Sequence, residues 1–278
     1  MKYIIITLLL GLTQLHALTL TTSHTTRKQG DVLTCYVSHP LPLKSPTLKF
    51  RHRTFTLFNH PKPGKNYHYI AYIGIDKRTP LGTHPLIVTA KNTTQKATKK
   101  IKVRSGKFPS ETITLPPKKA KMPSQTKQIR SEGSILGKQF RKKTAHKYFS
   151  GPFIHPAKGR FSSAFGTNRK YQGRITWQHS GLDIANKIGT PVLASHTGKV
   201  VLSKSLPIHG NTIMIDHGHG VISIYNHLHK RIAKVGQLVY QGKKIGTIGQ
   251  TGISTGPHVH WGLSVQNVRV NPLNAFEN

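Results

Sequence analysis

The 278-residue chain is poor in acidic residues. It holds only 7 Asp and Glu against 42 Lys and Arg, which gives a formal net charge of +35. A glycosidase that works with paired carboxylates needs two acids in one pocket, and only Asp183, Asp216 and Glu277 follow residue 132. The composition therefore argues against that class of enzyme. The positive charge favours binding to polyanions such as nucleic acid, anionic lipid or a cell-wall polymer.

Cysteine and long hydrophobic runs are also scarce. Cys35 is the single cysteine, so no intramolecular disulfide framework can hold the chain together. We expect this residue to be a small apolar side chain buried in a strand. The one strongly apolar run spans residues 3–12, after Met1-Lys2 and before a small residue at position 17. This pattern predicts a secretory signal peptide over residues 1–17, with an uncleaved N-terminal anchor as the alternative. The chain is then exported, to the periplasm or the cell envelope.

Residues 18–104 alternate between apolar and polar side chains in short runs separated by turn residues. The runs begin at Leu18, Val32, Thr47, Thr54, Tyr69 and Pro85. Short strands at this spacing predict a small β-sandwich as the N-terminal domain.

Residues 105–149 form a basic connector. Residues 96–147 carry 16 basic residues and only two acids, Glu111 and Glu132. Four prolines within residues 105–125 predict an extended linker. Residues 126–148 lack proline and place apolar side chains at near-helical spacing, which indicates a short helix, although two glycines weaken it.

Residues 150–278 return to β patterning with glycine at the turns. The expected strands begin at Thr190, Gly198, Asn211, Val221, Lys244 and His258. Their tight connections favour an antiparallel sheet or a partly open barrel without an ordinary helix. The whole chain is therefore expected to be all-β, apart from the short helix in the connector.

Histidine is unusually abundant, with 18 residues, and three His-x-His pairs occur. Residues i and i+2 of a strand share a face, so each pair could present two imidazoles together. The pair His217/His219 lies in a Gly-rich stretch and is predicted to form a solvated hairpin turn. The pair His258/His260 leads into Trp261 and reads as the start of a core strand.

A further pattern is His179-Ser-Gly-Leu-Asp183. Imidazole and carboxylate together form a usual zinc ligand set, and two His with one carboxylate leave a position for water. The alternative is a surface His beside an Asp that caps a turn. The apolar neighbours of Asp183 favour the first reading, because a carboxylate beside an apolar strand needs a cation or hydrogen-bond partners.

The order of these motifs resembles the lysostaphin-type (LytM-like) zinc metallopeptidases, which cut peptide bonds in bacterial peptidoglycan. The likeness runs from Phe153 to Pro272 and includes Trp177-Gln-His-Ser-Gly-Leu-Asp-Ile-Ala, Tyr225-Asn-His-Leu and Thr251-Gly-Ile-Ser-Thr-Gly-Pro-His-Val-His-Trp. The N-terminal piece is similar to a small β-domain that precedes the peptidase in some members. One departure is that Thr167-Asn168 stand where an Arg is common.

This resemblance implies a role for each matching side chain. The metal ligands are His179, Asp183 and His260, and the catalytic histidines are His227 and His258. Motif residues expected to bind substrate are Asn211, Tyr225 and Thr255. No role falls to His217, His219 or His229.

The chemistry of these residue types agrees with the implied roles. Zinc with two neutral imidazoles and one carboxylate keeps a charge of +1, enough to activate water and polarise a carbonyl. One catalytic His can move the proton while the other hydrogen-bonds the oxyanion, and the order of the two is open. No Glu is available as a general base, unlike in the His-Glu-x-x-His proteases.

We therefore expect an exported zinc D,D-endopeptidase acting on peptidoglycan stem peptides or cross-links. Two alternatives stay open: a non-enzymatic regulator that activates another wall hydrolase, and a polyanion-binding scaffold. Carboxylates of the wall are the expected targets of the positive charge, although the charge could be compositional only. Nucleic acid is not expected, because no such motif occurs. The N-terminal domain and linker are expected to cover the groove, which would make the full chain latent.

Overall fold

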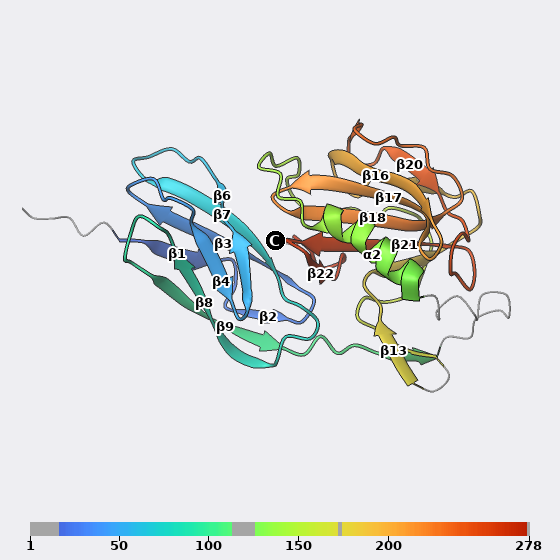
Figure 1. Cartoon of the computed structure of the whole chain (residues 1–278), viewed down its shortest axis with the longest axis horizontal. Helices are drawn as coiled ribbons and strands as arrows, with labels where there is room; N and C mark the ends of the chain where they lie inside the picture. The colour runs from blue at the N-terminus through green and yellow to red at the C-terminus, as the bar shows by residue number, and fades with distance from the viewer. Residues whose placement is uncertain (1–16, 113–125, 172–173, 277–278) are drawn as a thin grey trace, which may run out of the picture.

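The computed structural model describes residues 17–112, 126–171 and 174–276, and shows two β-rich domains side by side with one helix on the flank (Figure 1). Almost all of the predicted signal peptide, and residues 113–125 of the predicted linker, lie outside the described residues. Among the described residues, no helix is both long enough and apolar enough to cross a membrane.

The N-terminal domain is a β-sandwich. Its strands are β1 (Thr19–Thr22), β2 (Thr26–Lys28), β3 (Val32–His39), β4 (Thr47–Phe50), β5 (Arg53–Thr56), β6 (Phe58–Asn59), β7 (Tyr67–Gly74), β8 (Gly82–Thr89) and β9 (Ala97–Arg104). One sheet has the order β1-β3-β7-β6 and the other β2-β9-β8-β4-β5. The six predicted runs are all strands. The strand β9 was not foreseen, because Lys and Arg fill half of its 8 positions and only Ile101 and Val103 are buried.

The core of the sandwich contains apolar side chains that alternate inward from the two sheets. Leu33, Ile73, Leu48 and Leu86 are fully buried there. Cys35 lies among them with no exposed surface, as predicted, and burial raises the pKa of its thiol. A buried thiol with a raised pKa is a structural residue rather than a reactive one.

The C-terminal domain is built on a curled, mostly antiparallel sheet. Its strands are β11 (Arg160–Ser163), β12 (Asn168–Tyr171), β13 (Arg174–Gln178), β14 (Leu182–Ala185), β15 (Pro191–Leu193), β16 (Gly198–Leu206), β17 (Gly210–Gly218), β18 (Val221–Leu228), β19 (Leu238–Val239), β20 (Lys244–Thr247), β21 (His258–Val265) and β22 (Val268–Val270). The main sheet has the order β11-β14-β21-β18-β17-β16-β19, with β22 paired to β21. The all-β fold class predicted from the sequence is confirmed, and the described residues of this domain contain no helix.

The connector contains the helix α2 (Thr126–Phe140), which agrees with the prediction of a short helix. Its apolar face places Leu136 and Phe140 against Met214 and Ile222 of the main sheet. Gly133 and Gly137 interrupt the pattern without ending the helix, because packing outweighs the modest propensity cost of glycine. Ahead of the helix, β10 (Ser110–Thr112) pairs with β12 of the C-terminal domain. The described parts of the connector are therefore docked on that domain.

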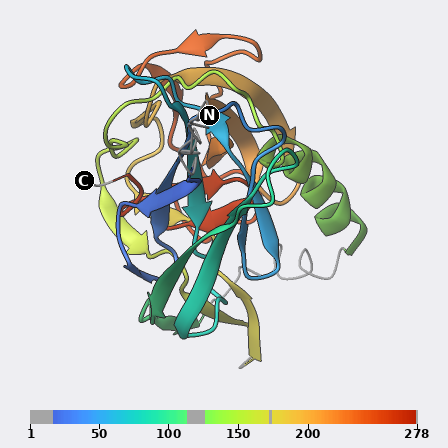
Figure 2. The ribbon, with the colours of Figure 1, turned by 90° about the vertical axis from the view of Figure 1, so that its left-hand side faces the viewer.

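The two domains share an apolar boundary. Phe58, Ile70 and Tyr72, on the outer face of the β1-β3-β7-β6 sheet, belong to the same buried cluster as the core of the C-terminal domain. A Cβ atom on Gly74 would lie 2.8 Å from Cβ of Val268 and from Cγ1 of Val270, so a larger residue would collide with these side chains. Figure 2 shows the sandwich in front of the C-terminal sheet, with the helix beside them.

The prediction that His217 and His219 form a solvated hairpin is wrong. His217 lies near the end of β17 and His219 lies in the turn between β17 and β18, but both residues are buried. Residues 144–149 cover this turn, and His219 stacks on Phe58 of the N-terminal domain with ring centroids 4.4 Å apart. Burial lowers the pKa of His217 to about 3. The glycines that form the turn could be recognised in the local sequence, whereas the residues that bury the two histidines come from distant segments of the chain.

Candidate metal centre

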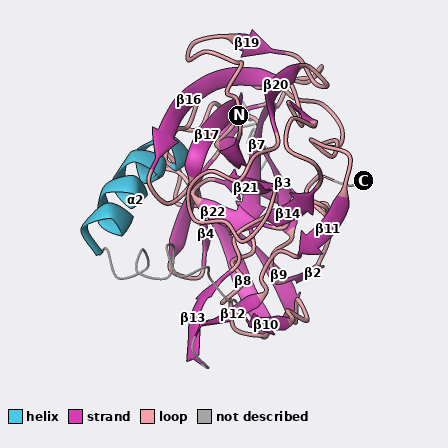
Figure 3. Ribbon diagram, turned by 90° about the vertical axis from the view of Figure 1, so that its right-hand side faces the viewer, coloured by secondary structure: helices cyan, strands magenta, loops and turns pink. Residues whose placement is uncertain are grey.

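Two neighbouring strands bring the centre together. The strands β14 and β21 lie near each other in Figure 3, and in their antiparallel ladder Asp183 stands directly opposite His260. Cross-strand partners of this kind have Cβ atoms about 4.5–5.5 Å apart, so their side chains meet on one face. His179 lies on the turn that leads into β14. The three predicted ligands thus lie together, although His260 is far from His179 and Asp183 in the sequence.

The ligand atoms of these residues converge on one point. Nε2 of His179 lies 3.0 Å from Oδ1 of Asp183 and 2.9 Å from Nδ1 of His260, and that Nδ1 lies 2.9 Å from the same Oδ1. Among the described residues, this is the group of three that could hold a metal ion. Metal–ligand bonds of about 2.0–2.2 Å would let all three atoms reach one ion.

The protonation pattern fits a metal ion. Nδ1 of His179 lies 2.9 Å from the carbonyl of Ala164 and donates to it, which leaves a lone pair on Nε2 facing the cluster. Burial lowers the pKa of His260 to about 3, so its imidazole is neutral, as a ligand must be. With the two ring nitrogens unprotonated, a shared cation would bind the lone pairs of all three ligand atoms at once.

Asp183 is almost fully buried and ionised. Burial alone raises the pKa of its carboxyl, but His179 and His260 outweigh that effect, and the pKa lies well below its ordinary value. Its second oxygen, Oδ2, accepts a hydrogen bond of 2.6 Å from Nη2 of Arg169. One oxygen is therefore fixed by a guanidinium while the other faces the ligand cluster.

The sequence interpretation did not identify Arg169 as part of the site. It noted that Thr167-Asn168 occupy the place where an Arg is common in the resembling family; the guanidinium comes from the next residue. Arg169 also donates to Glu111 of the connector, with Nε 2.8 Å from Oε1. A signal for Glu111 was present in the sequence, since it is one of only two acids among 16 basic residues.

The backbone around His179 is held from two sides. Nζ of Lys77, in the N-terminal domain, donates to the carbonyls of Gln178 at 2.8 Å and of His179 at 3.3 Å. Gly181 allows β21 to approach, since a Cβ atom there would lie 2.4 Å from the carbonyl oxygen of Trp261 and 2.8 Å from the His260 ring. The site therefore depends on a close approach that only glycine permits.

Two further histidines stand beside the cluster. The rings of His227 and His258 are 4.8 Å apart, and Nε2 of His258 lies 3.8 Å from Oδ1 of Asp183. His227 donates from Nδ1 to the carbonyl of Thr251, and His258 donates from Nδ1 to the carbonyl of Gly256, each at 2.9 Å. Each ring thus keeps an Nε2 lone pair. Burial, then the neighbouring His258 and His260, lower the pKa of His227.

His227 occupies the left-handed region of backbone space, with φ of 61°. A non-glycine residue held there costs on the order of 1–3 kcal/mol and usually persists because surrounding contacts fix it. Here the His227 N–H donates to the carbonyl of His209, at 3.0 Å. The turn at His209 therefore helps to hold the backbone of His227, while the carbonyl of Thr251 orients its ring.

The three residues expected to bind substrate differ in position. Thr255 is exposed on the loop before β21, and Asn211 is partly exposed and donates to the carbonyl of His229. Tyr225 is fully buried, and its hydroxyl already bonds Ser195 and Ser223. Its hydroxyl faces the core, so the expectation of substrate contact is corrected to a structural role.

A curled antiparallel sheet that carries a His-Asp-His cluster beside two histidines defines a metallopeptidase type of site. The profile of peptidase family M23 matches residues 177–272. The C-terminal domain of the chain therefore matches the profile of this family. The resemblance drawn from the sequence is thus confirmed.

Known relatives agree with that family. Peptidoglycan DD-endopeptidase ShyA of Vibrio cholerae is 41% identical over 120 residues, which are 43% of this chain and 28% of the relative. DD-carboxypeptidase/endopeptidase Mpg of Neisseria meningitidis is 40% identical over 115 residues, 41% of this chain and 26% of the relative. The chain thus matches little more than a quarter of these relatives' length.

One crystal structure resembles most of the chain. It is described as an M23 peptidase from Pseudomonas aeruginosa and has 29% sequence identity and a TM-score of 0.61. The match covers 84% of this chain and 88% of that one. The two-domain arrangement, and not only the peptidase sheet, therefore has a counterpart among solved structures.

Proposed function

We propose that the protein is an exported zinc endopeptidase that hydrolyses peptide bonds in peptidoglycan, with D,D cross-links as its substrate. The observation that carries the proposal is the convergence of His179, Asp183 and His260 beside His227 and His258. Two neutral imidazoles and one carboxylate are a usual donor set for catalytic zinc. The names of the relatives supply the substrate class.

The side chains divide the chemistry between them. Zinc held by the three ligands would supply the Lewis acid that polarises the scissile carbonyl and acidifies water. His227 and His258 each keep an unprotonated Nε2, so either can accept a proton from the attacking water and return it to the leaving amine. The second ring, once protonated, can donate a hydrogen bond to the tetrahedral oxyanion. The carboxylate of Asp183 stays ionised throughout.

The test separates metal binding from catalysis. We expect the purified chain to bind one zinc ion and to release stem-peptide monomers from defined cross-linked murein, measured by mass spectrometry. His260→Ala is expected to lose both zinc and activity. His227→Ala is expected to keep the zinc and lose at least about 100-fold in rate, the scale of one acid–base group. Unchanged cleavage by His260→Ala would refute the ligand assignment.

A non-enzymatic activator is the competing function. Such a protein could keep the fold without needing His227 and His258 side by side. The discriminating measurement is cleavage of isolated murein by the purified protein, with and without a chelator. Release of fragments that the chelator abolishes supports the enzyme, and binding without release supports the activator.

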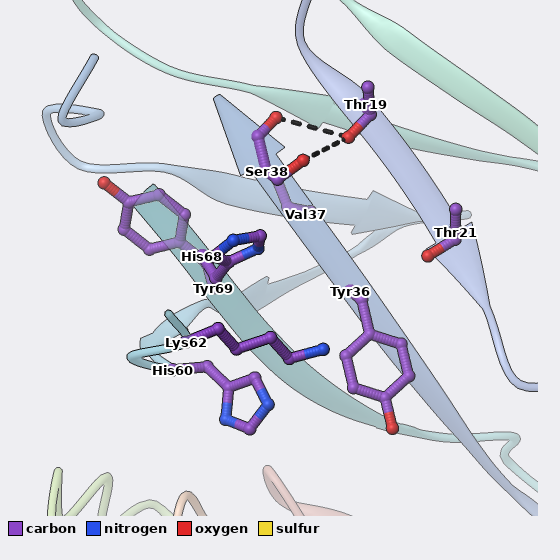
Figure 4. A pocket seen from close by; sticks show the side chains of 9 residues that line it. All are labelled: Thr19, Thr21, Tyr36, Val37, Ser38, His60, Lys62, His68 and Tyr69. Carbon is purple, nitrogen blue, oxygen red and sulfur yellow. Dashed lines mark hydrogen bonds between the residues drawn. The ribbon is translucent and has the colours of Figure 1, made fainter. Parts of the chain in front are cut away.

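We further propose that the positive charge binds anionic wall polymers, and one pocket supports this proposal (Figure 4). It lies on the part of the β1-β3-β7-β6 sheet where Tyr36, Ser38 and His68 face outward, and it has a volume of about 250 Å³. The ammonium of Lys62 lies 5.2 Å from the centre of the Tyr36 ring. No acid is among the pocket's lining residues, so the local field is positive.

A matched charge reversal tests that role. Lys62→Glu is expected to weaken pelleting with purified sacculi more than Lys49→Glu does. Lys49 is exposed on β4, in the other sheet, and its reversal changes the net charge equally. Equal weakening by the two variants would show that only total charge matters, and would remove the pocket from the proposal.

Latency stays a prediction from the sequence. Lys77 of the N-terminal domain contacts the backbone carbonyl of His179 rather than the ligand atoms of the centre. The comparison of residues 18–278 with residues 150–278 on the same murein tests the prediction. Higher specific activity of the shorter chain supports a cover, equal activity removes it, and lower activity reflects the loss of Glu111 and Glu132 with the connector.

A further inference from the structure

Glu111 comes from outside the peptidase domain and lies beside its centre. The strand β10 of the connector adds in parallel to β12, and β12 pairs with β13, at the end of the molecule shown at the bottom of Figure 3. In that ladder Glu111 stands opposite Arg169. Since parallel partners project to the same side, the register itself brings the carboxylate to the guanidinium.

A short chain of charged hydrogen bonds runs from Glu111 to the ligand cluster. Nε of Arg169 donates to Oε1 of Glu111 at 2.8 Å, and its Nη2 donates to Oδ2 of Asp183 at 2.6 Å. The hydroxyl of Ser163 donates to the same Oε1 at 3.0 Å and accepts from the guanidinium at 3.1 Å. Charge-assisted bonds of this length are about twice as strong as neutral ones.

Burial increases along this chain toward the centre. The side chains of Glu111, Arg169 and Asp183 are 28%, 17% and 7% exposed. Solvent therefore screens the inner pair least. The guanidinium is planar and rigid, so fixing its Nε edge on Glu111 also fixes the Nη2 edge that holds Asp183.

The balance of charges also indicates that Glu111 strengthens metal binding. Arg169 places a positive charge beside the carboxylate that must hold a dication, and this charge alone opposes metal binding. The carboxylate of Glu111 neutralises it. Removing that carboxylate both loosens the orientation of Asp183 and leaves the guanidinium uncompensated beside the metal.

We propose that Glu111 is a positioning residue of the metal centre, acting through Arg169 on Asp183, so that the docked connector completes the site. The inference rests on the proposed metal function. It assigns to a residue outside the matched family segment a role in metal affinity. Outer partners of metal ligands typically contribute 10- to 100-fold to affinity.

The experiment measures zinc affinity of the full chain by competition with a fluorescent chelator, and the visible spectrum of the cobalt-substituted protein. Glu111→Gln keeps the shape and removes the charge. We expect 10- to 100-fold weaker zinc binding and a shifted cobalt spectrum, with Glu111→Asp recovering part of the loss. Circular dichroism melting confirms that each variant is folded.

The path through Arg169 is tested by a double substitution. In an Arg169→Met chain, or Arg169→Lys if the first does not fold, adding Glu111→Gln is expected to change zinc affinity by less than threefold. A full additional loss would show that Glu111 does not act through Arg169. Zinc binding by Glu111→Gln within twofold of the unmodified chain overturns the inference. An unmodified chain that binds no zinc would refute the proposed function itself.

Discussion

Glu132 offers the sharpest test of how the connector helix supports the peptidase domain. Its carboxylate lies in α2, is only 3% exposed, and receives three N–H groups from the β16–β17 hairpin. These are the backbone N–H groups of Ile208 at 2.6 Å and His209 at 3.2 Å, and Nδ1 of His209 at 2.5 Å. The His209 carbonyl in turn accepts the N–H of His227.

Glu132→Gln removes the charge at nearly constant volume. Its amide nitrogen cannot accept, so at least one of the three donors loses its partner. Hydrogen bonds to charged groups contribute about 1.5–3 kcal/mol each, and an unpaired buried donor costs on the order of 1–3 kcal/mol. We therefore expect the free energy of unfolding at pH 7 to fall by about 2 kcal/mol, with a lower turnover rate because the His227 backbone is less firmly held.

The assay is equilibrium urea unfolding, with murein cleavage measured on the same preparations. Arg130→Gln, on the exposed face of the same helix, is the control and should change stability by less than about 0.5 kcal/mol. A loss below 0.5 kcal/mol for Glu132→Gln, equal to the control, would refute the reasoning that this buried carboxylate anchors the hairpin.

Acid adds a second signature to the same residue. Burial raises the pKa of Glu132, but the side-chain bond from His209 and the backbone N–H bonds outweigh it, and the net pKa is lowered. A carboxylate with a lowered folded pKa stabilises the fold above its unfolded pKa of about 4.3, and this stabilisation disappears as the pH falls through the folded value. The Glu132→Gln chain should therefore lose less stability than the unmodified chain below about pH 4.

Three further outcomes concern the domain boundary, the helix α2 and the buried turn. Gly74→Val is expected to destabilise by about 1–3 kcal/mol through overpacking against Val268 and Val270. By contrast, Gly133→Ala, with open space around it in α2, should stabilise by about 0.5–1 kcal/mol; thermal melting measures both, and the reverse order would contradict the packing argument. The lowered pKa of His217, about 3, means that the unfolded chain binds one more proton below about pH 6.5. Stability should fall by up to about 1.4 kcal/mol per pH unit from pH 6.5 toward 3, and His217→Gln should flatten that slope in urea titrations.

The strands could be predicted from the sequence because the alternation of side chains that defines them lies within a short segment. Alternation along residues 32–37 reflects a strand packed mainly by one face, whereas the strand at residues 258–265 is buried on both faces, and the structure contains both strands. The strand β9 was missed because only two of its residues, Ile101 and Val103, are buried, and basic residues lie beside them in the sequence. The residues of the candidate metal centre could also be proposed from the sequence, since their pattern and order resemble a known family before any distance is measured.

The supports of the site were not readable. Arg169 on β12 donates to Asp183 on β14. In the connector, which has no peptidase motif, Glu111 binds Arg169 and Glu132 binds His209. Their partners are 58 and 77 residues away in sequence. Periodicity carries no information about such pairs, because registers between strands from different domains depend on how those domains dock.

The sequence by itself determined the all-β class and the buried Cys35, and it predicted two β-domains and the His-Asp-His set whose side chains the structure brings together. Only the tertiary structure decided that His217 and His219 are buried and that Tyr225 faces the core. It also decided that the connector's two acids lie against the peptidase domain. The physical reason is that side-chain types and their period are encoded along the chain, whereas burial and charge pairing depend on segments brought together from a distance.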